Sequence, residues 1–449
     1  MPEWHPWFRD WSDVLRASFL LAVPPLLAFD PPEALRLLLT FLLCLIPRLA
    51  AAPATFDLGF NLAMALQAWG NVTNVFETWL PYHDIVHLVL TGASAALVYI
   101  LLLRARLLPD LTREHSIHQR LAIVTLILMM GTTINAIYEE YEWFAINVLH
   151  ANLLEYYQHD INDLWFGSAG SVLAGLAMVA WASARWPTRR HADDDPLRRL
   201  LPKLERLLPD ASADGPEAAS PNERPPHIRL PRALVGDWTW LVRDVNDLFR
   251  LSFLAGAVAA GISGDWQLAV RFAVTFVGAA AVRWLQAPRA FDLVFNVAMA
   301  FQAWGDVLGA YQGVPGFADW VHFAVALAFA MLLYLALVRL DLLPEFEAEP
   351  RVHSRGAILI AAMCLGMAAG TYYALYIWVA NRILGAAFPV DWDRLTGELG
   401  LAWVGGVVAG LLLIVWDAYG WGSRRRLPAR TLQREGPRPG AAPGTGRRL

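Results

Sequence analysis

The chain has 449 residues, of which 57% are hydrophobic and 17% charged, with a formal net charge of −4. Soluble globular proteins carry about 45–50% apolar and about 25% charged residues, so this composition excludes an ordinary soluble globule and a disordered chain. The small net charge gives no reason to expect nucleic acid as a partner, because nucleic-acid-binding domains are strongly basic. Long apolar stretches separated by short polar ones predict an all-α, polytopic membrane protein whose first partner is the lipid bilayer.

The first half of the chain predicts six helices, each close to the ~20 residues that a membrane crossing needs. They are expected at 15–30, 33–49, 56–75, 84–104, 119–148 and 161–184. Polar residues interrupt the third segment, so a re-entrant or interfacial helix is the alternative there. A matching set is expected at 250–265, 268–286, 291–310, 319–339, 356–384 and 396–418. The sequence therefore predicts twelve spans, or ten if the third segments do not cross.

The two sets of helices are related by an internal repeat. Residues 56–70 read FDLGFNLAMALQAWG and residues 291–305 read FDLVFNVAMAFQAWG, with twelve of fifteen positions identical at an offset of 235 residues. We expect two homologous halves, residues 1–186 and 234–422, each of about six transmembrane helices. The segment 187–233 between them is charged and rich in proline, which predicts a solvated linker.

Basic residues determine the expected orientation. Lysine and arginine gather in the linker, in the tail 423–449 and in the loop 104–120, whereas 71–83 and 143–160 contain neither. Six spans per half place every basic segment on one side, which the positive-inside rule assigns to the cytoplasm. We therefore expect a multi-pass inner (plasma) membrane protein with both termini and the linker cytoplasmic, and with two repeats of parallel orientation. The Arg-rich tail is expected to be disordered.

Ionisable residues gather where three helices of the first half reach the non-cytoplasmic side. They form pairs at i,i+3 spacing, which puts both members of a pair on one helix face. Because an ionisable group inside a span costs about 2.5–3.5 kcal/mol, each needs a reason to be there. We interpret Glu139, Glu142 and Asp163 as candidate catalytic groups. The candidate metal ligands are Asp84, His87 and Asp160.

Three explanations of this cluster stay open. Carboxylates with an imidazole suit a divalent metal such as zinc, manganese or iron, which would activate water. Closely packed carboxylates also form proton relays. Alternatively, the aspartates cap helices and the glutamates are solvated. The second half keeps Asp319 and His322 but has Ala374 and Ile377 in place of the two glutamates, which favours one active and one structural half.

A second polar set occurs in both halves and lies toward the cytoplasmic side. It consists of Arg48, Asp57 and Asn61, with Arg283, Asp292 and Asn296 at the same offset. We expect ion pairs between Arg48 and Asp57 and between Arg283 and Asp292, because pairing lowers the cost of charges in a membrane. The alternative is that the arginines capture the phosphates of anionic lipid headgroups.

The order of these motifs resembles the YjdF-like and VanZ-like bacterial inner-membrane proteins, an uncharacterised group. The shared pattern is an Asp-x-x-His helix start, a later helix with glutamate, and an acidic helix start followed by spaced glycines. Here these are Asp84-x-x-His87, Glu139 to Trp143, and Asp160 to Gly175. Two features depart from the pattern: Gly167 stands where it has asparagine, and two copies are fused. The resemblance implies a membrane protein linked to the cell envelope and supplies no established chemistry.

Three functions are compatible with these observations. The first is an integral membrane protein of unassigned activity that binds or moves a lipid or small solute between the two halves. The second is a metal-dependent hydrolase that acts on a lipid-linked substrate at the outer face. The third is a proton-coupled transporter that uses the same carboxylates. Small residues at 167–175 and 403–410 predict close helix packing in each case.

Overall fold

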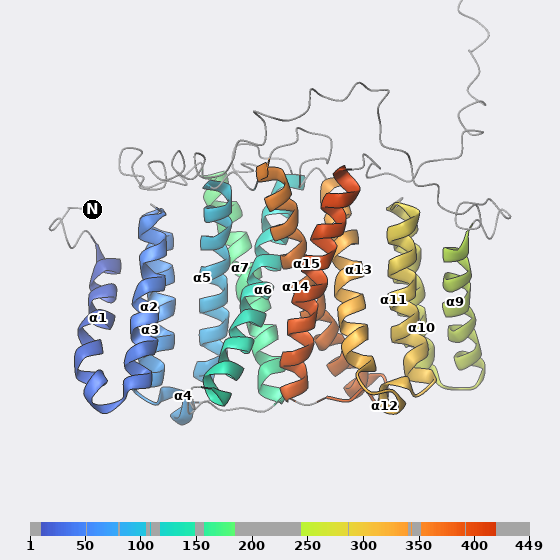
Figure 1. The fold of residues 1–449 in the computed structure, drawn as a ribbon, viewed down its shortest axis with the longest axis horizontal. Coiled ribbons are helices and arrows are strands. Elements are labelled where there is room, and N and C mark those ends of the chain that lie inside the picture. The colour runs from blue at the N-terminus through green and yellow to red at the C-terminus, as the bar shows by residue number, and fades with distance from the viewer. Residues whose placement is uncertain are drawn as a thin grey trace, which may run out of the picture.

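The computed structural model describes residues 10–50, 52–79, 81–104, 108, 117–148, 157–184, 244–285, 287–339, 343, 352–390 and 392–418. Within these residues every regular element is a helix and no strand occurs, which confirms the expected all-α class. Figure 1 shows the long helices standing side by side with nearly parallel axes. The predicted linker 187–233 and tail 423–449 lie outside the described residues.

Seven helices form the described part of the first half, and their bounds follow the predicted apolar segments. They are α1 (Trp11–Phe29), α2 (Pro31–Leu49), α3 (Ala54–Val72), α4 (Val75–Thr78), α5 (Pro81–Arg104), α6 (Ile117–Asn147) and α7 (Tyr157–Ser183). The third predicted segment is one continuous helix of 19 residues, α3. Asp10 and Asp30 cap α1 and α2, because their side chains accept from the backbone N–H groups of Ser12 and Glu33.

The described part of the second half follows the same order. Its helices are α9 (Val245–Ile262), α10 (Trp266–Trp284), α11 (Arg289–Val307), α12 (Ala310–Gly313), α13 (Phe317–Arg339), α14 (Val352–Ile383) and α15 (Trp392–Ala418). Asp244 and Asp265 cap α9 and α10 through the backbone N–H groups of Asn246 and Leu268. The aspartate caps of the first two long helices are thus the same in both halves.

Eight of these helices are long and apolar enough to cross a membrane: α1, α5, α6, α7, α9, α13, α14 and α15. The chain is therefore a helical, multi-pass membrane protein. The other four long helices, α2, α3, α10 and α11, have 19 residues each but fall short of this apolarity. Figure 1 shows them standing among the apolar helices in the same bundle.

Charged side chains on these four helices are paired inside the protein. Arg271 of α10 forms an ion pair with Asp306 of α11. Asp57 of α3 and Asp292 of α11 also have arginine partners on neighbouring helices. Because paired charges cost less inside a membrane than isolated ones, these helices can lie beside apolar spans while their charges contact protein.

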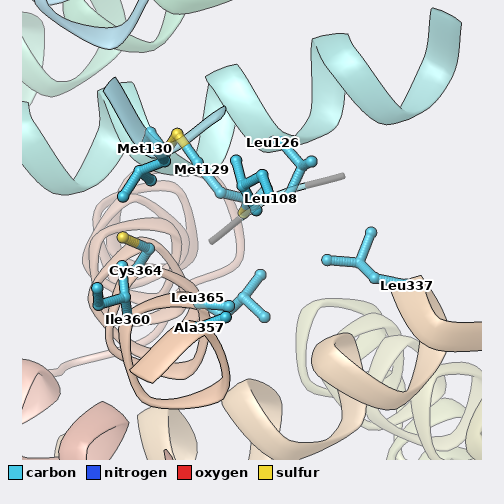
Figure 2. A pocket seen from close by; sticks show the side chains of 11 residues that line it. Leu108, Leu126, Met129, Met130, Leu337, Ala357, Ile360, Cys364 and Leu365 are labelled. Atoms are coloured by element: carbon cyan, nitrogen blue, oxygen red, sulfur yellow. The ribbon is translucent and has the colours of Figure 1, made fainter. Parts of the chain in front are cut away.

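The two halves meet at the centre of the bundle, where α6 lies beside α14 (Figure 1). Thr133 of α6 donates a hydrogen bond to the main-chain carbonyl of Cys364 on α14 at 2.9 Å. A pocket between α5 and α6 on one side and α13 and α14 on the other is lined by hydrophobic side chains, including Met130 and Leu365 (Figure 2). The described contact between the halves is therefore mainly apolar.

Glycines bring α5 and α7 together, as the small residues of 167–175 predict. A Cβ atom at Gly92 would lie 2.7 Å from the carbonyl oxygen of Gly170, so this approach requires glycine. In the second half, a Cβ atom at Gly406 of α15 would lie 2.9 Å from the carbonyl oxygen of Ala362 on α14. The contact of Gly92 on α5 with Gly170 on α7 fixes the rotation of each helix about its axis. It thereby sets the direction of the polar side chains near the ends of these two helices.

Successive helices alternate in direction across the bundle. The beginning of α1, the end of α7, the beginning of α9 and the end of α15 therefore lie at one end of the bundle, the upper end in Figure 1. The beginnings of α5 and α7 and the end of α6 lie together at the lower end. These are the three helix ends at which the sequence places its acidic residues and histidines.

Candidate metal centre

Six ionisable side chains from three helices meet near the lower end of the bundle. They are His83 and His87 of α5, Glu139 and Glu142 of α6, and His159 and Asp163 of α7. The two members of each pair are three or four residues apart, so each pair lies on one helix face. All six residues are buried.

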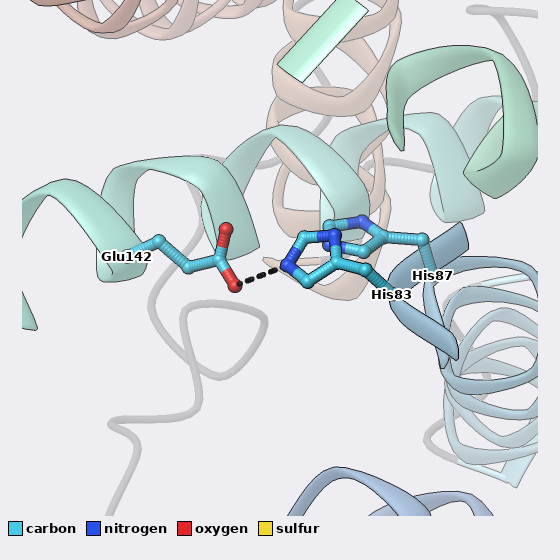
Figure 3. A group of neighbouring side chains, drawn as sticks. All are labelled: His83, His87 and Glu142. Carbon is cyan, nitrogen blue, oxygen red and sulfur yellow. Dashed lines mark ion pairs between the residues drawn. The ribbon is translucent and has the colours of Figure 1, made fainter. Parts of the chain in front are cut away.

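Asp163 lies in the middle of this cluster. Its Oδ1 is 3.1 Å from Nδ1 of His83, and its Oδ2 is 3.9 Å from Nε2 of His87 and 4.0 Å from Nδ1 of His159. On the other side of His83, its Nε2 lies 3.7 Å from Oε1 of Glu142, the contact drawn in Figure 3. The imidazole of His83 is therefore held between carboxylates from α6 and α7.

The imidazole ring of His83 packs against the rings of His87 and His159. The ring centroids of His83 and His159 are 4.1 Å apart, and those of His83 and His87 are 4.7 Å apart. Figure 3 shows the rings of His83 and His87 side by side, with Glu142 approaching from α6. This packing gathers ring nitrogens from two helices into one small volume.

Asn135 of α6 orients His87. Its Oδ1 lies 3.0 Å from Nδ1 of His87 and accepts from the hydroxyl of Thr91, while its Nδ2 donates to the main-chain carbonyl of Asp163. Because an amide oxygen can only accept, this network assigns the proton of His87 to Nδ1 and leaves Nε2 with a lone pair. Histidines that bind metals are usually held in this way, by a hydrogen bond from the other ring nitrogen.

Several buried atoms of the cluster, Oε1 of Glu142 among them, have no hydrogen-bond partner among the described residues. Three of these atoms are Nε2 of His87, Oε1 of Glu139 and Oδ2 of Asp163, in residues that are 1%, 4% and 0% exposed. These three residues offer ligand atoms that lie within 4.8 Å of one another. A buried polar atom without a partner costs about 1–3 kcal/mol, and a cation would satisfy all three lone pairs together.

Two further groups of three ligand atoms are equally compact. One combines His83, His159 and Asp163, and the other combines His83, His87 and Glu142. Sets that mix imidazole with carboxylate suit zinc, manganese or iron. Across the described ranges of the chain, no such group occurs outside the first half.

The structure brings together some of the predicted site residues and leaves out others. His87, Glu139, Glu142 and Asp163 lie in the cluster. Asp84 and Asp160 belong to none of the three ligand groups. Each of these aspartates directly follows a histidine of the cluster, and adjacent residues point roughly 100° apart around a helix.

His83, His159 and Asn135 belong to the site, and the sequence did not single them out. At the offset of 235 residues their counterparts are Ala318, Arg394 and Gly370. These three positions differ between the halves as the glutamate positions do, whereas Asp84 is kept as Asp319. Change between the halves is thus a signal for these residues, although His87 of the cluster is kept as His322 and Asp160 outside the ligand groups becomes Leu395.

The corresponding place in the second half contains a guanidinium group. Nε of Arg394 donates to Oε1 of Glu398 at 2.9 Å, and Oε2 of Glu398 lies 3.2 Å from Nε2 of the buried His322. Arg394 and Glu398 stand at the offset of His159 and Asp163. In the second half, Glu398 thus pairs with the guanidinium of Arg394. In the first half, the corresponding Asp163 is surrounded by imidazoles.

At the opposite end of the bundle, the structure corrects the predicted ion pairs of the first half. Asp57 pairs with Arg16 of α1, and Arg48 pairs with Asp13 instead of with Asp57. Arg16 reaches into the protein, where its Nε also donates to the main-chain carbonyl of Cys44, whereas Arg48 remains 31% exposed at the end of α2. Asn61 completes the network by donating to Asp57 at 2.8 Å.

The second half corrects the second predicted pair in the same way. Asp292 pairs with Arg250, and Arg283 pairs with Asp247 at 3.0 Å. Asn296 donates to Asp292 at 2.8 Å. Because Arg48 and Arg283 each have a carboxylate partner, a structural role explains them without lipid headgroups.

Comparison of the chain with protein-family models, with curated proteins and with solved structures finds no match. The resemblance to YjdF-like and VanZ-like proteins therefore stays a prediction from short motifs.

Proposed function

We propose that the protein is an integral-membrane hydrolase that depends on a divalent metal held in its first half. The observation that carries this proposal is the convergence of His87, Glu139 and Asp163, each of which has one buried atom with no hydrogen-bond partner in the described chain. An apolar bundle buries such groups only when something compensates for their lost hydration. A divalent cation would compensate for all three at once.

The charges of the cluster also support a cation. Glu139, Glu142 and Asp163 are buried, and the ion pairs that they form in the described structure are all with imidazoles. At the same place in the second half, Arg394 pairs with Glu398. A metal ion in the first half would supply the positive charge that a guanidinium supplies in the second.

The position of the cluster suits a substrate carried by the membrane. His83 is the third residue of α5 and His159 the third of α7, while Glu139 lies eight residues before the end of α6, so at 1.5 Å per residue the cluster lies roughly 3–12 Å inside the helix ends. Lipid headgroups lie just beyond that level. A metal held by the cluster would lower the pKa of a bound water to about 7. Attack of that water on an ester or phosphoester would form the new bond to oxygen as the bond to the leaving oxygen breaks, and Glu142 would pass the proton of the water to the leaving oxygen.

Metal analysis of the purified protein tests this proposal. We expect wild-type protein in detergent to bind a divalent transition metal, Asp163→Ala to lose it, and His87→Ala to bind less of it. Glu398→Ala is the matched control, because it removes the carboxylate at the same offset in the second half and leaves every ligand of the first half in place. Wild-type protein that binds no metal under any loading condition would refute the proposal.

A proton-coupled transporter is the second candidate. The hydrogen bond between His83 and Asp163 and the nearby glutamates can store protons. A transporter, however, needs a polar route near the middle of the membrane between its moving parts. The pocket between the halves is lined by hydrophobic side chains, which favours the hydrolase and also weighs against passage of a small polar solute.

We also propose that the chain consists of two homologous repeats of six membrane helices in the inner membrane. The shared order of long helices, the shared aspartate caps and the shared arginine–aspartate networks support this. It follows that α2, α3, α10 and α11 cross the membrane, with both termini and the linker 187–233 in the cytoplasm. The cluster then faces the outside, and the second half is the structural one.

A further inference from the structure

We infer that the centre holds two metal ions bridged by Asp163. This inference rests on the metal-dependent function proposed above, and adds the number of ions and the role of each ligand. The ligand groups His83–His159–Asp163 and His87–Glu139–Asp163 share only Asp163. Each group supplies the three protein ligands that are typical of a catalytic site with one open position.

The two oxygens of Asp163 face different histidines. Oδ1 lies 3.1 Å from Nδ1 of His83. Oδ2 lies 3.9 Å from Nε2 of His87, and the ring of His159 lies at 4.0 Å from the same oxygen. A carboxylate can bridge two ions, and Asp163 is the carboxylate that contacts histidines of both ligand groups.

The spacing of the ligand atoms fits two ions. Ligand atoms within one group lie within 4.8 Å of one another. Around an ion with bonds of about 2.0–2.2 Å they would be roughly 3–4 Å apart. The distances from the oxygens of Asp163 to His83, His87 and His159, at 3.1 Å, 3.9 Å and 4.0 Å, already lie in that range. Paired ions in hydrolases lie about 3.5–4 Å apart, a distance that one carboxylate spans.

The charges also favour a pair of ions. Glu139, Glu142 and Asp163, together with the buried Asp160 near Glu139, carry four negative charges when ionised, so one divalent ion would leave buried negative charge. Two divalent ions would balance these charges.

The competing arrangement is a single ion held by His83, His87 and Glu142, the group drawn in Figure 3. That arrangement needs neither His159 nor Glu139. The two-ion arrangement assigns these two residues to different ions, so variants at the two positions distinguish the alternatives.

The experiment counts ions in protein that has been purified in detergent, stripped of metal and reloaded with Mn²⁺. We expect about two ions per wild-type chain by mass spectrometry of the metal, and an exchange-coupled signal by electron paramagnetic resonance. His159→Ala and Glu139→Gln should each retain about one ion and lose the coupling, and Asp163→Asn should lose both ions. Glu398→Gln, the control in the second half, should keep both ions and the coupling.

The outcomes separate this inference from the proposed function. One ion per wild-type chain with an uncoupled signal would overturn the two-ion centre and leave a metal-dependent hydrolase standing. No ion would overturn both. Full occupancy in His159→Ala would also overturn the two-ion centre, because the single-ion site does not use that ring. Monodisperse elution and an unchanged helical circular dichroism spectrum establish that each variant is folded.

Discussion

The carboxylate of Asp13 accepts from Arg16 on its own helix and forms an ion pair with Arg48 on α2. Arg16 also forms an ion pair with Asp57 on α3 and donates a hydrogen bond to the main-chain carbonyl of Cys44 on α2. Two negative and two positive side chains thus connect the first three helices into a neutral network. An equal network in the second half joins α9, α10 and α11.

The network predicts a large effect for the buried arginine and a small one for the exposed arginine. Arg16→Met removes the guanidinium group that pairs with both Asp13 and Asp57. The carboxylate of Asp57, which is 0% exposed, is then left without its arginine. We expect a loss of about 3–5 kcal/mol of stability, because the remaining charge stays buried and uncompensated. Thermal unfolding in detergent measures this loss.

Arg48→Met is the matched control for that substitution. Arg48 is 31% exposed, so water replaces most of what the ion pair provides, and the expected loss is about 1 kcal/mol or less. Equal losses for the two variants would contradict the view that Arg16 is the central member of the network.

At the scale of whole helices, the contact between α5 and α7 positions four of the six cluster residues. Gly92 and Gly170 allow the two backbones to approach closely, and a Cβ atom at Gly170 would strike the main chain of Leu88. Gly167 leaves room in the same way for the side chain of Asn135, which holds His87. The centre therefore depends on glycines that contact no ligand themselves.

Gly170→Ala is expected to separate α5 from α7 and to weaken both stability and metal binding. The reason is that His87 on α5 and Asp163 on α7 then lie too far apart to share an ion. Gly59→Ala in α3 is the control, because a Cβ atom there meets nothing within 4 Å and alanine favours a helix by about 1 kcal/mol. Metal content and unfolding temperature check both variants, and normal metal content in Gly170→Ala would show that the contact does not position the site.

The sequence predicted where the helices lie but not how they are rotated. Apolar stretches located each long helix, because burial in lipid demands about 20 apolar residues whatever the packing. The sequence singled out Asp84 and Asp160, and their neighbours His83 and His159 belong to the ligand groups, because residue spacing alone does not define which face turns inward. That face is set by contacts such as Gly92 with Gly170, which join positions 78 residues apart.

At the other end of the bundle, the sequence predicted that arginines and aspartates form ion pairs, but it paired the wrong residues. Asp57 and Arg48 are close in sequence, which suggested a pair, whereas the true partner Arg16 lies 41 residues away. The residue types in the network could be predicted, because buried charges require partners. The connections could not, because they depend on how α1 packs against α3.

At the scale of the whole molecule, the described ends of α3 and α11 lie at the end of the bundle that carries the cluster. Thr73 and Leu308 are exposed there, whereas Ala184 is exposed at the other end of the bundle. Cys44 is buried and Cys364 is half-buried, so the native cysteines give little background in labelling experiments.

Labelling of introduced cysteines tests the proposed orientation. We expect Thr73→Cys and Leu308→Cys to react with a membrane-impermeant maleimide on intact cells, because the cluster end faces outward. Ala184→Cys should react only after the membrane is permeabilised. Reaction of Ala184→Cys alone on intact cells would reverse the orientation and place the centre in the cytoplasm.

Arg394 has a consequence for how the protein is made. The second half encodes the counterion of Glu398 in its own sequence, so it can complete its packing as soon as it is synthesised. If the first half binds metal as proposed, its buried carboxylates have no metal counterion until the cell supplies one. Such a protein matures in two steps, and the second step depends on metal supply. In a metal-starved cell, we expect the first half without its ions to pack less stably and to be degraded more readily by membrane proteases.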